Sequence, residues 1–347
     1  MNNKKVKKII IKISSNLLNP DLDFDIIKEI TKEISTLKSK NYQFIIITSG
    51  AVIHGVKILK YDKKPGYLPL LQAAAAIGQI QLMTRYQSIF MNHGLISSQI
   101  LVSIDDFKVR KRYLNLRNTI ETLLEINAIP IINENDSINT EELKFGDNDH
   151  LSSLITLMMD FDMLIILTDV NGLYNKDPNK YNDAQLINNI YDLNEKYLEY
   201  TSSSISRYTS GGMKTKIESA LKVTKAGVNV FIGNGFNSSI IKILENKELG
   251  TYIKGNTKNV NARKKWLGFS PTEKGDVLID EGAYKALQNN FSLLASGISG
   301  VNGNFGRGSL INVIFSDKKV AQGLTNYSSK EIDLIKGKKS SDFNNYL

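Results

Sequence analysis

Several residue types and patterns are missing from this chain of 347 residues, and their absence narrows the chemistry it can perform. There is no cysteine, which excludes disulfides, thiolate metal ligands and a cysteine nucleophile. No apolar run approaches the roughly 20 residues that a membrane-spanning helix needs. The basic start is followed by a short apolar run, 9–13, which Lys12 interrupts, so it does not resemble a signal peptide. We therefore expect a cytoplasmic protein with no membrane association.

Two familiar nucleotide-binding motifs are also absent. The chain contains no G-x-x-x-x-G-K-S/T loop, and no G-x-G-x-x-G follows its first predicted strand. The three histidines, His54, His93 and His150, lack the spacing of metal ligands. We interpret each of them as a structural or surface residue.

The formal charge of +9 raises the question of nucleic acid. Only seven of the 44 basic residues are arginines, and the lysines are scattered along the chain. This distribution is typical of a lysine-rich surface and argues against RNA as a partner.

Apolar strand patterns alternate with amphipathic helix patterns through most of the chain. This alternation predicts an α/β fold with a mostly parallel sheet sandwiched by helices. Strands are predicted at 6–13, 44–47, 96–102, 129–132, 163–167 and 228–232. Helices are predicted at 25–40, 68–91, 114–126, 151–159 and 215–226.

The pattern changes after about residue 255. Residues 256–261 are polar and are interpreted as a linker, and the segments beyond 265 are short and rich in glycine. We therefore expect two domains, an α/β domain at 1–256 and a small β-rich domain at 262–347.

Several predicted strands end in polar or glycine residues. In open α/β sheets, ligands bind beyond the carboxyl ends of the strands, so several such ends indicate a polar site at one edge. The clusters are residues 12–16, 48–50, 133–136, 168–169 and 233–235.

Two further polar segments precede helices. Residues 146–149, Gly-Asp-Asn-Asp, can be explained by helix capping alone. Residues 210–216 contain a glycine pair whose backbone N–H groups can converge on phosphate. Lys214 and Lys216 then fall in the first helical turn, where the dipole disfavours cations. Their position indicates an anion nearby, although chance placement is the alternative in so lysine-rich a chain.

These segments, in this order, resemble the amino acid kinase family and, within it, the glutamate 5-kinases. The stretches that carry the resemblance are IIIKISSNLL, IIITSGAVIHG, IPIINENDSI, LKFGDNDHLSSL, LIILTDVNGLY and SGGMKTKIESA. The tail resembles the PUA domain that many of these kinases carry, through RKKWL, IDEGAYKAL, SLLASGI and VNGNFGRGSLINV. The chain ends before the last strand usual for that domain, so we expect the domain to be incomplete.

The resemblance implies a role for individual residues. Lys12 matches a lysine that contacts the transferred phosphoryl group, Lys216 one that neutralises the ATP phosphates, and Asp149 an aspartate that orients both. Residues matching those that hold L-glutamate are Ser49, Asp136 and Asn148. Residues matching nucleotide contacts are Lys12, Thr168, Asp169, Ser210, Gly211, Gly212, Met213, Lys214, Thr215 and Lys216. No metal ligand is assigned.

The implied reaction uses ATP and Mg²⁺ to phosphorylate the side-chain carboxylate of glutamate in the first step of proline biosynthesis. A carboxylate with a pKa of about 4.3 is already ionised near neutral pH, so no general base is required. The resemblance also implies feedback by proline, a homodimer or homotetramer, and glutamyl phosphate reductase as a partner. Ser14 and Ser15 replace the glycine and threonine usual in the family, and Thr209 replaces a glycine, which leaves the turnover rate open.

Other readings stay open. One is another amino acid kinase, acting on acetylglutamate or aspartate. A second is an RNA-binding protein, because PUA modules often bind RNA. A third is a protein that senses proline without catalysis.

Overall fold

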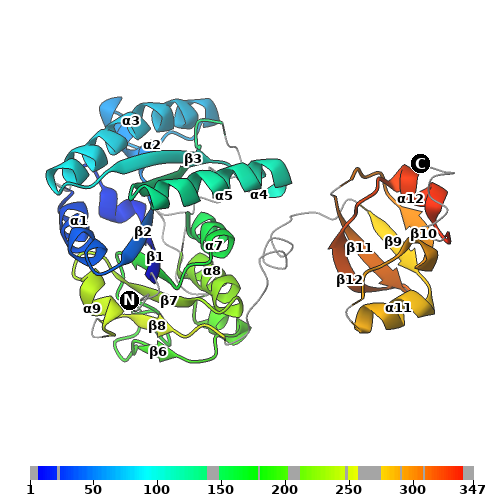
Figure 1. Ribbon diagram of the computed structural model, residues 1–347. Helices are drawn as coiled ribbons and strands as arrows, with labels where there is room; N and C mark the ends of the chain where they lie inside the picture. Colours follow the sequence, from blue (N-terminus) through cyan, green and yellow to red (C-terminus); the bar gives the residue numbers. More distant parts are fainter. Residues whose placement is uncertain are drawn as a thin grey trace, which may run out of the picture. The chain divides into compact units, whose positions relative to one another are not determined.

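The computed structural model describes residues 7–21, 24–138, 148–178, 180–201, 212–246, 249–256, 275–289, 291–307 and 309–338. The chain forms two compact units, Met1–Ala262 and Arg263–Leu347, each with its own sheet (Figure 1). None of the helices in the described ranges is long and apolar enough to cross a membrane.

An eight-stranded sheet forms the centre of the first unit, in the order β3-β4-β2-β1-β5-β7-β8-β6. Its strands pair in parallel except β7 with β8, so the expected mostly parallel sheet is confirmed. The strands are β1 (Lys7–Ile13), β2 (Tyr42–Ile47), β3 (Ser97–Val102), β4 (Ile129–Glu134), β5 (Met163–Thr168), β6 (Asn189–Ile190), β7 (Asn229–Asn234) and β8 (Thr251–Ile253).

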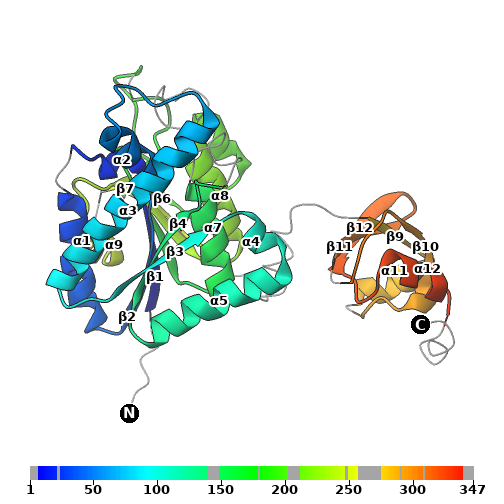
Figure 2. The ribbon, with the colours of Figure 1, turned by 90° about the horizontal axis from the view of Figure 1, so that it is seen from above.

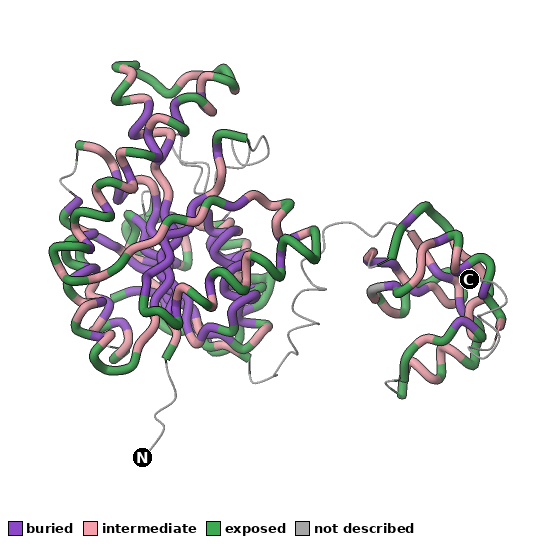
Figure 3. The backbone as a smooth tube through the Cα atoms, turned by 45° about the horizontal axis from the view of Figure 1, so that its top comes forward, coloured by how far each residue is buried: buried purple, intermediate pink, exposed green. Residues whose placement is uncertain are grey.

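Helices cover both faces of this sheet. Figure 2 shows α1, α3 and α9 on one side and α5, α7 and α8 on the other, and buried residues concentrate in the strands between them (Figure 3). The helices are α1 (Asp25–Lys38), α2 (Ala51–Ile58), α3 (Leu68–Asn92), α4 (Asp105–Lys108), α5 (Arg110–Glu125), α7 (Asn148–Met159), α8 (Met213–Lys225) and α9 (Ile240–Leu244), with 3₁₀ turns η1 (Ser15–Leu18) and η2 (Glu195–Thr201).

Alternation along β1 separates an apolar face from a functional one. Ile9, Ile11 and Ile13 belong to a core cluster with buried residues of α1, α3 and α9. Because successive side chains in a strand point to opposite faces, Ile10 and Lys12 lie on the side of α7. Lys12, the charged residue within the buried stretch 9–13 of this strand, is thus presented to a single helix layer.

Two glycines allow α2 and α3 to pack with their backbones in contact. A Cβ added at Gly55 would lie 1.7 Å from the carbonyl oxygen of Ala74, and one added at Gly78 would lie 1.9 Å from that of Ala51. Side chains at these positions would therefore push the helices apart. The contact holds the first residue of α2, which follows the polar end of β2, against the middle of α3.

In the part of the second unit that the structure describes, a small sheet packs with two α-helices. Its strands are β9 (Asp276–Ile279), β10 (Ile298–Asn302), β11 (Leu310–Phe315) and β12 (Lys318–Leu324), in the order β10-β9-β11-β12, and its helices are α11 (Glu281–Gln288) and α12 (Ser329–Ile335). Both helices have side-chain N-caps, from Asp280 and Ser328. The expected small β-rich module is confirmed, with its own core of six buried apolar residues.

Candidate active site

The polar ends of β1, β2, β4, β5 and β7 meet at the carboxyl edge of the first unit's sheet, as parallel pairing requires. Main-chain hydrogen bonds continue beyond the strands there. Ser14 N–H donates to the carbonyl of Leu167, and Thr48 N–H donates to that of Ile132. The loops that follow these strands are therefore held in register with the sheet.

Three buried charges form the centre of the site. Lys12 Nζ lies 2.5 Å from Asp149 Oδ1, and Lys216 Nζ lies 3.0 Å from Asp149 Oδ2. Asp149 has no exposed surface, and the two lysines are 2% and 3% exposed. Buried charges persist only when they are paired and hydrogen-bonded, so one carboxylate here holds two ammonium groups in fixed positions. These three charges carry a net charge of +1, which favours an anionic ligand.

The centre lies where two helices begin. Asp149 is the second residue of α7, and Lys216 belongs to the first turn of α8, after the N-cap residue Gly212. Gly212 has no side chain that could accept a hydrogen bond from the first N–H groups of α8. The first N–H groups of a helix carry partial positive charge and bind phosphate well. The expected position of Lys214 and Lys216 in the first turn is confirmed. Asp149 provides the negative charge near Lys216.

Buried amides lie beside this centre. Asn148 Nδ2 has two hydrogens and lies within hydrogen-bond distance of three acceptors, the carbonyl of Thr48 at 2.5 Å, Ser49 Oγ at 3.1 Å and Asn133 Oδ1 at 2.8 Å, so one hydrogen is shared between two of them. The Oδ1 atom of Asn148 is buried and has no hydrogen-bond partner among the described residues. This oxygen can accept a hydrogen bond from a donor group of a ligand.

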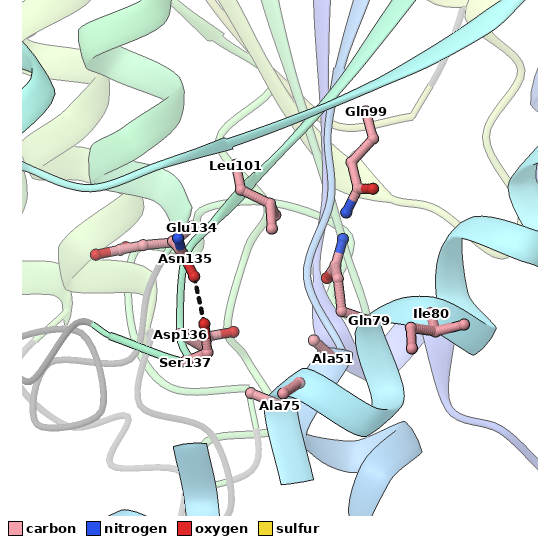
Figure 4. A pocket seen from close by; sticks show the side chains of 11 residues that line it. Ala51, Ala75, Gln79, Ile80, Gln99, Leu101, Glu134, Asn135, Asp136 and Ser137 are labelled. Carbon is pink, nitrogen blue, oxygen red and sulfur yellow. Dashed lines mark hydrogen bonds between the residues drawn. The ribbon is translucent and has the colours of Figure 1, made fainter. Parts of the chain in front are cut away.

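A pocket of about 270 Å³ opens next to these amides (Figure 4). It lies between α3, β3 and the segment after β4, and Asp136 lines it with a side chain that is 9% exposed. The lining residues are Ala51, Ala75, Ala76, Gln79, Ile80, Gln99, Leu101, Glu134, Asn135, Asp136 and Ser137. A carboxylate in a partly closed cavity suits a ligand ammonium group.

A second polar cluster lies at the end of β5. Thr168 Oγ1 donates to Asp169 Oδ1 at 3.0 Å, and Asn16 Nδ2 donates to Asp169 Oδ2 at 2.7 Å. Thr168 is buried and Asp169 is exposed. The turn after β1 is thereby joined to the turn after β5.

Two buried groups behind the site support its loops. His54 Nε2 donates to the carbonyl of Leu18 at 3.0 Å, joining α2 to the turn η1. Burial is the main cause that lowers the pKa of His54, so its ring is neutral at pH 7. Tyr86 OH lies 2.9 Å from Thr48 Oγ1, and burial raises the pKa of this tyrosine.

Within the described ranges, no three His, Cys, Asp or Glu side chains gather closely enough to hold a metal ion. Mg²⁺ is commonly held by one or two carboxylates together with substrate phosphates. A magnesium ion at this site would therefore depend on the phosphates of a ligand.

The model of the amino acid kinase family matches residues 7–234, which include the ends of β1, β2, β4, β5 and β7. The chain belongs to the amino acid kinase family. A model of the PUA domain matches residues 275–347. The expected family and the second domain type are thus confirmed.

Curated relatives in this family match along nearly the whole chain. Glutamate 5-kinase of Syntrophotalea carbinolica is 39% identical over 343 residues, covering 97% of this chain and 92% of the relative. Glutamate 5-kinase 1 of Bacillus subtilis is 41% identical over 344 residues, covering 97% and 94%. The solved structure of carbamate kinase from Giardia lamblia is 18% identical with a TM-score of 0.50, covering 72% of this chain and 99% of that one, and this likeness concerns the fold alone.

The structure brings most of the residues expected from the family resemblance to one edge. Lys12, Asp149 and Lys216 are in direct contact, and Asn148 contacts Ser49. Ser210 and Gly211 lie outside the described residues. The other expected positions lie at the same edge of the sheet: Gly212 to Thr215 at the start of α8, Asp136 at the pocket, and Thr168 and Asp169 at the end of β5.

Sequence reasoning missed two members of the amide group. Asn133 stands in the NEND segment but had no assigned role, and Gln79 lies in α3 among alanines. Asn133 could have been suspected from its place at a strand end. Nothing local in the sequence marks Gln79.

Proposed function

We propose that this protein transfers the γ-phosphoryl group of ATP to the side-chain carboxylate of L-glutamate, which is the activity of a glutamate 5-kinase. The observation that carries the proposal is the 39–41% identity to curated glutamate 5-kinases along nearly the whole chain. The pair of buried lysines around one aspartate supports it, because the reaction joins two anions.

The proposed chemistry is electrostatic. Lys12 contacts the phosphoryl group in transfer, Lys216 neutralises the ATP phosphates, and Asp149 keeps both ammonium groups in position. The attacking carboxylate is already ionised, so no side chain has to remove a proton. Fixed positive charges that meet the developing charge in the transition state supply the rate enhancement.

L-Glutamate is proposed to bind beside this centre. Asn148 Oδ1, buried and without a partner among the described residues, accepts from the substrate ammonium group, and Asp136 supplies its countercharge. Ser49 Oγ lies 3.1 Å from Asn148 Nδ2, so Ser49 is proposed to lie near the ammonium end of the substrate as well.

ATP is proposed to lie between the end of β5 and the start of α8. Thr168 and Asp169 contact the nucleotide, and residues 210–216 place backbone N–H groups and lysines on its phosphates. Mg²⁺ bound to those phosphates supplies further charge neutralisation.

We also propose the wider properties that the resemblance implies. They are a cytoplasmic homodimer or homotetramer, feedback by proline, and glutamyl phosphate reductase as the enzyme that takes over the product. The kinase activity is assigned to the α/β domain, so residues 1–256 alone are expected to be active and the tail to act in regulation or assembly.

The test is to incubate the protein with ATP, Mg²⁺ and a candidate substrate and to trap any acyl phosphate with hydroxylamine. Hydroxamate from glutamate, but not from aspartate or N-acetylglutamate, is expected. Product from one of the other substrates would identify a different amino acid kinase, and proline binding without product would identify a sensor.

A matched pair of variants ties the activity to the site. Lys216→Met should lower kcat by about 10²–10³-fold, the effect of losing one preorganised electrostatic contact. Lys225→Met changes an exposed lysine at the other end of α8 and should leave kcat unchanged. Equal kcat values in the two variants would contradict the role of Lys216.

A further inference from the structure

Three buried side-chain amides form a continuous chain from α3 to the start of α7. Asn133 Nδ2 donates to Gln79 Oε1 at 2.8 Å, and Asn148 Nδ2 donates to Asn133 Oδ1 at 2.8 Å. Gln79, Asn133 and Asn148 are 8%, 1% and 4% exposed. Each amide is therefore shielded from water, and its orientation depends on the other two.

Two main-chain groups determine the direction of this chain. The carbonyl of Thr48 can only accept, so the atom of Asn148 that meets it at 2.5 Å is the amide nitrogen. The N–H of Glu134 can only donate, so the atom of Asn133 that meets it at 2.9 Å is the amide oxygen. Asn133 must then present its nitrogen to α3, and Gln79 must accept with its oxygen.

The two ends of the chain are opposite in character. Asn148 Oδ1 and Gln79 Nε2 are both buried without a hydrogen-bond partner among the described residues. The acceptor end lies beside Ser49 and the charged centre, and the donor end borders the pocket that Asp136 lines. In Figure 4 the amide of Gln79 is directed toward Gln99, away from Asp136.

Packing alone does not explain Gln79. The neighbouring Gly78 already fixes the contact of α3 with α2. An apolar side chain would fill the same space without the cost of burying an amide. The only hydrogen bond that the structure records for the Gln79 side chain, within the described part of the chain, is the one to Asn133.

We propose that Gln79 is a positioning residue for the amino acid substrate. By accepting from Asn133 Nδ2, it keeps Asn133 Oδ1 on Asn148 Nδ2, and so keeps Asn148 Oδ1 directed at the substrate ammonium group. Gln79 acts through Asn133 and does not touch the nucleotide. The inference rests on the proposed function, since it concerns how the same site holds glutamate.

Gln79→Met tests this because methionine has a similar length and cannot replace the amide as an acceptor. It leaves Asn133 Nδ2 unpaired, and we expect the KM for glutamate to rise about tenfold, the effect of one unsatisfied buried amide. The KM for ATP should not change. Gln87→Met is the matched control, because Gln87 is an exposed glutamine of the same helix, lies outside the pocket lining, and should leave both KM values as in the wild type.

A double-mutant cycle with Asn133→Leu separates positioning from direct contact or packing. If Gln79 acts through Asn133, Gln79→Met should cause no further rise in the KM for glutamate once Asn133 is absent. The inference would be overturned if the two substitutions raised the KM for glutamate by independent factors that multiply. An unchanged KM in Gln79→Met, or an equal rise in Gln87→Met, would also overturn it. Gln79→Leu repeats the cycle with a different shape if Gln79→Met does not melt cooperatively. If the wild-type protein forms no hydroxamate from glutamate, both the proposed function and this inference are contradicted. If the protein is active but the effects of Gln79→Met and Asn133→Leu are independent, only the inference is contradicted.

Discussion

Replacing Asp149 by asparagine should weaken the fold as well as the reaction. The asparagine keeps the volume and can still accept hydrogen bonds, but it leaves Lys12 and Lys216 buried without the negative charge that now lies 2.5 and 3.0 Å from them. Removing one partner of a buried ion pair typically costs about 3–5 kcal/mol. For a unit of this size, 1 kcal/mol corresponds to about 2–4 °C, so the melting temperature should fall by roughly 6–20 °C.

ATP should distinguish this cause from a general packing defect. The phosphates would supply the missing negative charge, so ATP should raise the melting temperature of Asp149→Asn by more than it raises that of the wild type. Urea unfolding followed by circular dichroism gives the free energy of unfolding, and thermal melts with and without ATP give the shift. Asp192→Asn, at an exposed carboxylate away from the site, is the control and should stay within about 0.5 kcal/mol of the wild type. The reasoning is refuted if Asp149→Asn is as stable as this control.

Three further changes are expected to have separate effects. Gly55→Ala should destabilise the protein by at least about 1–3 kcal/mol in urea unfolding, because its methyl group meets a backbone carbonyl at 1.7 Å, whereas Gly66→Ala has open space and should be neutral. Asp136→Ala should raise the KM for glutamate, because it removes roughly 1–3 kcal/mol of binding free energy, and should leave the KM for ATP unchanged. A loss of ATP affinity instead would show that Asp136 belongs to the nucleotide site and not to the glutamate site. Burial, and then Lys222, lower the pKa of His150 from 6.5 to about 4. The unfolded chain therefore binds a proton between pH 6.5 and 4 that the folded chain does not, and stability falls as the pH falls through this range. His150→Gln should make the unfolding free energy less steep in pH there, and an unchanged slope would exclude this histidine as a cause.

The sheet and most helices of the first unit could be predicted because their signals are local. The apolar run before Lys12 and the helical spacing of residues 25–38 both identify their elements within one or two positions. Helix α2 was not predicted because it is only eight residues long and contains Gly55, a residue that disfavours helices. Gly55 is required there by the close contact of α2 with α3, which the sequence does not show. Strands β6 and β8 have two and three residues, too few for any periodicity to be visible.

The site divides in the same way. Lys12, Asp149 and Lys216 stand in segments typical of the family, so the sequence alone indicates them, and the structure adds that they are in contact. Gln79 is one of several glutamines in the same helix, and only the structure distinguishes it from Gln72 and Gln81. Its partner is 54 positions away in the sequence, and the link between them arises from the packing of α3 against the sheet.

The alternation along β1 determines which kinds of genetic change this segment can accept. Exchanging one isoleucine for valine removes a methyl group and leaves every other side chain on its own face. Deleting or inserting a single residue before Lys12 would turn the ammonium group toward α1 and α3, among the isoleucines and aromatic rings of the core, and would present an isoleucine to Asp149. In this strand, substitutions between apolar residues are therefore tolerated, whereas insertions and deletions are not.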